Sequence, residues 1–213
     1  MLVNERIEKE IEKASEEHLY YVMANKALFG SPDNFSTVQY MNSKNIRNQV
    51  KFNELLHAKL VQLVDKNGIY LDFGVGPGFL EYVNNNSKQK LHLTTVEWEP
   101  QVDCFSSIRK SFDVDVNYLA NNILEDDFEI RNCETFYDYV ILQRFFPIYK
   151  TVDKKRISDV LKKFTPYGKY ALVVEADVNW SKSQWDYILS ITEKRTKVFG
   201  KWNIFKINLE QFK

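Results

Sequence analysis

Residues 69–81 read Ile-Tyr-Leu-Asp-Phe-Gly-Val-Gly-Pro-Gly-Phe-Leu-Glu. The apolar run that opens this stretch is typical of a buried strand, and the apolar spacing after it predicts a helix. Between the two, Gly74, Gly76 and Gly78 occupy alternate positions. Glycine has no Cβ, so such a turn can adopt positive φ and let a ligand lie against bare backbone. The following helix points unpaired N–H groups at that ligand. The stretch therefore predicts a strand, a nucleotide-binding turn and a helix.

The spacing of the glycines separates two kinds of nucleotide-binding turn. A dinucleotide fingerprint has the pattern Gly-x-Gly-x-x-Gly, and its last glycine would fall at Phe79. Here Asp72 stands two places before the first glycine. This pattern resembles motif I of the class I S-adenosylmethionine-dependent methyltransferases. The resemblance implies that the loop holds the methionine part and the ribose of S-adenosylmethionine. A tight strand–helix turn without a ligand is the alternative.

A second motif follows in residues 91–97, Leu-His-Leu-Thr-Thr-Val-Glu, which reads as a strand that ends in an acid. Glu97 lies 25 positions after Asp72, near the offset of about 20 residues expected of a carboxylate that binds ribose hydroxyls. A carboxylate can accept two hydroxyl hydrogen bonds at once. The second motif of the same family looks like this, and the resemblance implies that Trp98 packs on the adenine. Alternatively, Trp98 is a half-buried aromatic residue at the sheet edge.

The composition excludes several classes of function. The 29 Lys and Arg residues balance the 29 Asp and Glu residues, whereas a dedicated nucleic-acid binder usually has a basic excess. Cys104 and Cys133 show neither metal-type spacing nor a paired pattern, and the three histidines are widely separated, so no metal is expected. No apolar run reaches membrane-spanning length, and the first residues lack the apolar core of a signal peptide. We expect a reduced, cytoplasmic location without membrane association.

The first 55 residues are expected to form a helical N-terminal cap. Apolar residues at helical spacing predict helices over 5–28 and 43–65. In the family that the chain resembles, the segment before motif I commonly folds over the cofactor and contributes to substrate choice. The resemblance therefore suggests a substrate-binding role for four aromatic residues of this segment, Tyr20, Tyr21, Phe35 and Tyr40. Their alternative role is to pack helices against one another.

Strands and helices alternate through the rest of the chain. We expect strands at 114–119, 137–142 and 169–174, helices at 100–112, 153–164 and 183–191, and a closing hairpin of 195–199 with 202–209. The resemblance covers residues 56–213. The fold class is thus α/β: a Rossmann-like class I methyltransferase sheet of seven mostly parallel strands with a C-terminal antiparallel hairpin and helices on both faces. The chain is interpreted as a single domain, 1–213, with a core of 56–213.

Further candidate site residues follow the later strands. In open α/β sheets, ligands bind at the carboxyl ends of the strands. Asn121 and Asn122 stand where family members often carry a Gly-Asp pair whose acid or amide contacts the adenine amino group. An asparagine carbonyl can still accept from that amine. The departure from the Gly-Asp pair leaves Asp126 as a competing candidate.

Gln143 and Arg144 follow the fourth strand, and Glu175 follows the fifth. We expect Gln143 at the cofactor and regard all three as candidate bases or orienting groups for the methyl acceptor. Further candidates for this role are Asp177, His57 and His18.

The sequence predicts an S-adenosylmethionine-dependent methyltransferase, of the EC 2.1.1 class, that acts on a small molecule or a protein side chain and releases S-adenosylhomocysteine. The chain lacks the Asp/Asn-Pro-Pro-aromatic motif and the Pro-Cys nucleophile of the best-marked nucleic-acid methyltransferases, so a nucleic-acid acceptor is not expected. A non-catalytic S-adenosylmethionine-binding module or partner subunit is the alternative. An aminopropyltransferase-like enzyme is disfavoured, because residues 75–77 do not match its motif. The acceptor, the methylated atom and the oligomeric state, a homodimer included, stay open.

Overall fold

The computed structural model describes residues 5, 8–9, 12–13, 43–63, 67–98, 106–121, 123, 125–144, 153–176 and 180–213. Within these ranges the strands are β1 (Ile69–Phe73), β2 (His92–Trp98), β3 (Tyr118–Ala120), β4 (Tyr137–Gln143), β5 (Gly168–Ala176), β6 (Thr192–Phe199) and β7 (Trp202–Asn208). The helices are α2 (Ser43–Leu63), α3 (Phe79–Asn85), α5 (Ser106–Phe112), α6 (Lys154–Lys163), α7 (Lys182–Ile191) and the short 3₁₀ helix η4 (Leu209–Phe212).

The strands form one seven-stranded sheet in the order β3-β2-β1-β4-β5-β7-β6. The strands β1 to β5 pair in parallel, whereas β7 runs antiparallel between β5 and β6. The strand order reverses beside β1, which has β2 on one side and β4 on the other. The predicted fold class is therefore confirmed, including the antiparallel hairpin at the C-terminal end. A reversal of this kind opens a crevice at the carboxyl ends of the two inner strands, where ligands bind in such sheets.

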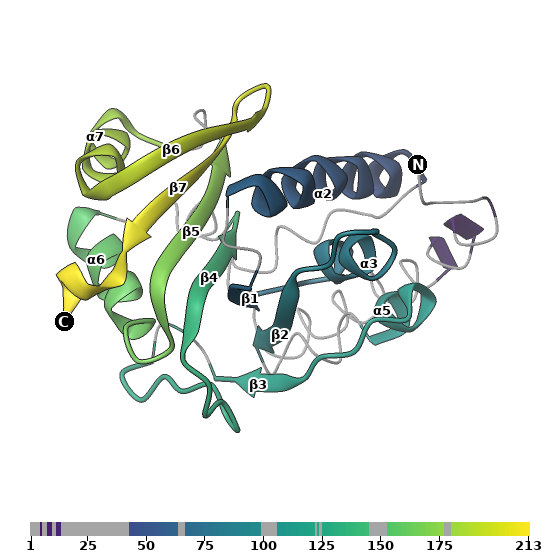
Figure 1. Cartoon of the computed structure of the whole chain (residues 1–213), viewed down its shortest axis with the longest axis horizontal. Coiled ribbons are helices and arrows are strands. Elements are labelled where there is room, and N and C mark those ends of the chain that lie inside the picture. Colours follow the sequence, from purple (N-terminus) through teal and green to yellow (C-terminus); the bar gives the residue numbers. More distant parts are fainter. Residues whose placement is uncertain are drawn as a thin grey trace, which may run out of the picture.

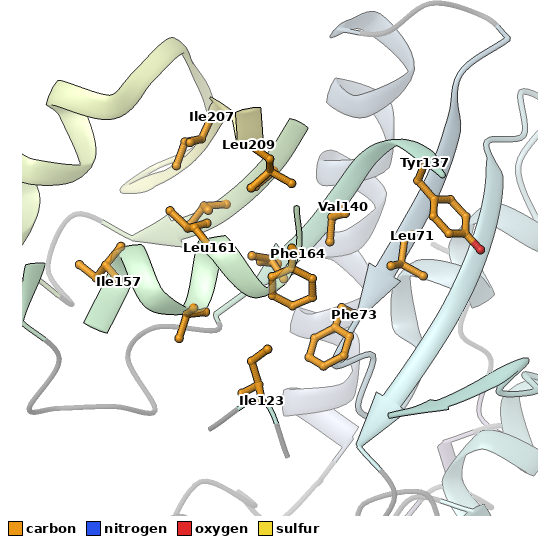
Figure 2. Close-up of a cluster of buried hydrophobic side chains, with 14 of the residues drawn as sticks. Leu71, Phe73, Ile123, Tyr137, Val140, Ile157, Leu161, Phe164, Ile207 and Leu209 are labelled. Carbon is orange, nitrogen blue, oxygen red and sulfur yellow. The ribbon is translucent and has the colours of Figure 1, made fainter. Parts of the chain in front are cut away.

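Helices cover both faces of the sheet (Figure 1). Successive side chains of a strand point to opposite faces, so Leu71 and Phe73 of β1 belong to one buried cluster and Tyr70 to another. The first cluster lies under α6 and α7, and the second lies under α2 and α3. In Figure 2, the Phe164 ring that follows α6 lies between Leu161 and Phe73, and its centroid is 5.0 Å from that of Phe73. Burying a side chain of this size stabilises the fold by about 2 kcal/mol.

Helix α2 crosses the boundary expected between residues 55 and 56. Its residues Phe52, Leu56 and Leu60 share one buried cluster with Tyr70 and Leu172 of the sheet. Helix α2 is therefore part of the helical layer that covers the sheet. The division into a cap and a core, and the helix expected over 5–28, stay predictions, since only residues 5, 8–9 and 12–13 of the first 42 are described.

The prediction of a strand over 114–119 is wrong in its bounds, because β3 covers only Tyr118–Ala120. Pairing with β2 begins at Tyr118, which lies opposite Val96. Val114 is buried for another reason: its N–H donates to the Arg109 carbonyl at the end of α5, and its side chain packs under Gly78. The alternation of Val114, Val116 and Tyr118 therefore spans a loop and a strand rather than one strand.

The helix expected over 100–112 is described from Ser106 onward. Among the helices of the described ranges, none has the length and apolarity needed to cross a membrane.

Candidate cofactor site

The glycine-rich loop leaves β1 at Gly74 and enters α3 after Gly78. All three glycines have left-handed backbones, with φ of 73° at Gly74, 53° at Gly76 and 79° at Gly78. Among the residues that the structure describes, no atom lies within 4 Å of a Cβ built on Gly74 or Gly76. The backbone at these two positions therefore borders open space, as the binding of a ligand against bare peptide groups requires. Gly78 serves packing instead, because its Cβ would come within 2.6 Å of Val114 Cγ1.

The loop is fixed by hydrogen bonds to the neighbouring strand β2. The Gly74 N–H donates to the Val96 carbonyl over 2.9 Å. The Gly76 N–H donates to the Glu97 carboxylate, with 2.6 Å between N and Oε2. Glu97 is only 1 % exposed. The Glu97 carboxylate and the glycine-rich loop are therefore in direct contact.

Arg109 of α5 is part of this arrangement, and the sequence reasoning missed it. Its Nη2 lies 3.1 Å from Glu97 Oε2, and its Nε donates to the Gly76 carbonyl over 2.8 Å. The side chain is 4 % exposed. One signal could have indicated this residue: Arg109 precedes the buried Phe112 by three positions, which places both on the same face of a helix.

Asp72 lies at the centre of the site, 2 % exposed in β1. Burial, reinforced by repulsion from the Glu81 carboxylate, raises the pKa of Asp72 to about 8. A hydrogen bond with the Gln143 side chain acts in the opposite direction, and the nearby Glu97 carboxylate adds to the increase in the pKa. At neutral pH the Asp72 carboxyl is therefore mostly protonated. In that form it can donate a hydrogen bond as well as accept one.

A second group of candidate residues lies at the carboxyl ends of β4 and β5. Arg144 has an unusual left-handed backbone, with φ of 50°. Its guanidinium carbon lies 5.1 Å from the ring centroid of Phe52 and 4.7 Å from that of Trp202. Burial lowers the pKa of Arg144, and attraction to the fully buried Glu175 opposes that shift. Two of the residues proposed as acceptor-orienting groups, Arg144 and Glu175, are thus electrostatic neighbours, and Arg144 also lies against two aromatic rings.

Two other predicted residues have structural partners. The Asn121 side chain directly after β3 donates to the Asp127 carbonyl over 2.9 Å and accepts from the Glu129 N–H over 2.8 Å, so it holds the loop that follows. The His57 ring on α2 is buried 3.0 Å from Asn84 Oδ1 on α3, where it connects the two helices. Burial lowers the pKa of His57.

Several candidates lie outside the described residues: Asn122, Tyr20, Tyr21, Phe35, Tyr40, His18 and Asp177. Trp98 ends β2, but its side chain is not among those described, and Asp126 is exposed. The described side chains include no group of three or more His, Cys, Asp or Glu residues that could hold a metal ion.

Comparisons by sequence find no relative: no protein-family model matches the chain, and no curated protein matches it. Comparison of structures gives many matches. The mitomycin 7-O-methyltransferase MmcR has a TM-score of 0.55 and 13% identity, over 91% of this chain and 67% of its own. The magnesium protoporphyrin IX methyltransferase ChlM from Synechocystis PCC 6803, solved with bound S-adenosylmethionine, has a TM-score of 0.51 and 13% identity, over 88% of this chain and 96% of its own.

The 16S rRNA methylase ArmA has a TM-score of 0.52 and 14% identity, over 79% of this chain and 91% of its own. This chain has the fold of class I S-adenosylmethionine-dependent methyltransferases. The resemblance seen in the sequence is therefore confirmed at the level of the fold.

Proposed function

We propose that this protein is an S-adenosylmethionine-dependent methyltransferase that transfers a methyl group to a small-molecule acceptor. One observation carries the proposal: two glycines with positive φ border open space beside the buried Glu97 carboxylate, at the edge of the sheet where ligands bind in this kind of fold. The structural likeness to a methyltransferase solved with S-adenosylmethionine supports the choice of cofactor.

Different residues at this edge of the sheet would contact different parts of the cofactor. Gly74 and Gly76 would border the methionine part and the ribose, because their backbones are open on one side. Glu97 would accept hydrogen bonds from the ribose hydroxyls. Gln143 would lie beside the cofactor, with its side chain hydrogen-bonded to Asp72. Trp98 and Asn122 would lie toward the adenine, with Asn121 shaping that end of the site through the loop that it holds.

S-adenosylmethionine, when bound, supplies a methyl group already activated as a sulfonium. The protein then mainly positions the acceptor and excludes water. Arg144 and Glu175, at the ends of β4 and β5, are the described candidates for orienting the acceptor. A neutral amine would need no base, whereas a hydroxyl acceptor would need one, and Glu175 is a buried carboxylate near the carboxyl end of β5.

The balance of charges supports a small acceptor. With 29 basic and 29 acidic residues, the chain has no excess positive charge to attract RNA. Two of the structural neighbours named above are methyltransferases for mitomycin and magnesium protoporphyrin IX, whereas one methylates rRNA. A protein side chain is the alternative acceptor.

Calorimetric titration of the purified full chain with S-adenosylmethionine and S-adenosylhomocysteine tests the proposal. We expect micromolar binding that Glu97→Ala weakens at least about tenfold, which corresponds to about 1.4 kcal/mol. Glu134→Ala, which removes an exposed carboxylate, should bind like the wild type. Transfer of labelled methyl to a panel of small hydroxyl and amine acceptors would then identify the substrate class.

The possible results separate the hypotheses. Binding together with methyl transfer to a small molecule would support the proposal. Binding without transfer to any acceptor would favour the non-catalytic module. If neither ligand binds to the wild type, the proposed cofactor is wrong.

A further inference from the structure

Gly76, Glu97 and Arg109 form a closed ring of hydrogen bonds. The Gly76 N–H donates to Glu97 Oε2, and Arg109 Nη2 lies 3.1 Å from the same oxygen. Arg109 Nε completes the ring by donating to the Gly76 carbonyl. Both peptide groups of the central glycine are thus bonded to two charged side chains. These side chains come from different elements, β2 and α5.

The geometry of this ring requires a guanidinium. Nε and Nη2 are donors on the same edge of one planar group, so Arg109 can reach the Gly76 carbonyl and the Glu97 carboxylate together. A lysine ammonium is a single charge on a flexible stem and has no such pair of parallel donors. The pair is also shielded from water, since Arg109 is 4 % exposed and Glu97 is 1 % exposed. Hydrogen bonds to charged groups are strongest under these conditions.

We propose that Arg109 is a positioning residue for cofactor binding, which holds the Glu97 carboxylate and the Gly76 backbone in the orientation that recognition of the ribose hydroxyls requires. The inference rests on the proposed function, because it concerns the same site. Arg109 contacts the carboxylate and the loop, and it acts on the ribose through them. Without the guanidinium, the Glu97 carboxylate would lose one of the contacts that orient it, and the Gly76 carbonyl would lose its donor.

The test compares two ligands that differ only at the ribose: S-adenosylhomocysteine and its 2′,3′-dideoxy analogue. The wild type should bind S-adenosylhomocysteine roughly 10- to 100-fold more tightly than the analogue, as expected for hydrogen bonds to a charged group. In Arg109→Met this preference should fall to within about threefold, while affinity for the analogue stays close to the wild-type value. Arg109→Lys should behave like Arg109→Met. Lys110→Met, the exposed neighbour on α5, should retain the full preference.

A structural role would give a different pattern. If Arg109→Met weakens the binding of both ligands equally, the preference for S-adenosylhomocysteine over the analogue is unchanged. Arg109 then does not position Glu97 for the ribose, and the inference is wrong. The same holds if binding of neither ligand changes. If the wild type binds S-adenosylhomocysteine with no preference over the analogue, the inference fails although the cofactor is correct. If the wild type binds neither ligand, the proposed function itself fails.

Thermal unfolding of each variant shows whether it is folded. Should Arg109→Met fail to fold, the double variant Glu97→Gln/Arg109→Met replaces it, because it leaves no buried carboxylate without its guanidinium. If Arg109 acts on the ribose through Glu97 and Gly76, the double variant will bind the dideoxy analogue as well as Glu97→Gln alone. Weaker binding of the analogue by the double variant would overturn the inference.

Discussion

Val114 lies so close to Gly78 that a Cβ on the glycine would come within 2.6 Å of Val114 Cγ1. Gly78 also has φ of 79°, a conformation that costs other residues about 1–2 kcal/mol. We therefore expect Gly78→Ala to destabilise the protein by roughly 2–4 kcal/mol, the sum of this strain and of overpacking. Urea denaturation would measure the change in the free energy of unfolding.

Two variants separate the two costs. Gly76→Ala introduces a Cβ at φ of 53° into open space, so it should show the backbone strain alone. Combining Gly78→Ala with Val114→Ala should recover stability relative to the sum of the two single variants. If the costs of these two substitutions simply add, the contact between them is not the cause.

The contact between Gly78 and Val114 separates what can be predicted from the sequence from what cannot. The glycines, the acid at the end of β2 and the order of the strands are local signals, since turn residues and apolar periodicity act within a few positions. Val114 and Arg109 are different. Their burial depends on a loop and a strand that are distant in the sequence, so the alternation around Val114 predicts a strand, and the predicted site does not include Arg109. Only the folded arrangement brings Arg109 to Glu97 and Gly76.

The buried carboxyl of Asp72 should make stability depend on pH. Its pKa is raised from 3.8 to about 8 by folding, so between these values the folded state holds a proton that the unfolded state has released. Linkage then requires the contribution of Asp72 to stability to fall as the pH rises through this window. In Asp72→Asn, which cannot ionise, the stability relative to the wild type should rise with pH, on the order of 1 kcal/mol per pH unit.

Urea midpoints of both proteins at pH 5, 6, 7 and 8 would measure this difference. Asp186→Asn, which changes an exposed carboxylate on α7, gives the baseline for a surface substitution. If the free energy of unfolding of Asp72→Asn minus that of the wild type stays constant, or falls as the pH rises, the raised pKa of Asp72 is contradicted.

Asn84 connects three elements through one buried amide. Its Oδ1 lies 3.0 Å from His57 Nε2 and accepts from the Leu91 N–H over 2.8 Å, and its Nδ2 donates to the Leu91 carbonyl over 3.1 Å. Loss of these contacts in Asn84→Ala should cost roughly 2–4 kcal/mol of unfolding free energy, at about 1 kcal/mol for each hydrogen bond and more for partners left buried. The exposed neighbour Asn85→Ala should cost much less. Equal losses in the two variants would show that the buried amide does not hold α2, α3 and β2 together.

Arg144 and Glu175 should be coupled energetically, because the half-buried Arg144 and the fully buried Glu175 attract one another at the carboxyl ends of β4 and β5. Arg144→Met keeps a Cβ at φ of 50°, so backbone strain is the same in both proteins and only the charge and its stacking on Phe52 and Trp202 are lost. Arg144→Met leaves the buried Glu175 carboxylate without this attraction, which should cost about 1–3 kcal/mol of unfolding free energy. Glu175→Gln in the Arg144→Met background should therefore recover part of that loss. A double-mutant cycle of unfolding free energies would measure the coupling, and strict additivity of the two substitutions would mean that the carboxylate does not stabilise the guanidinium.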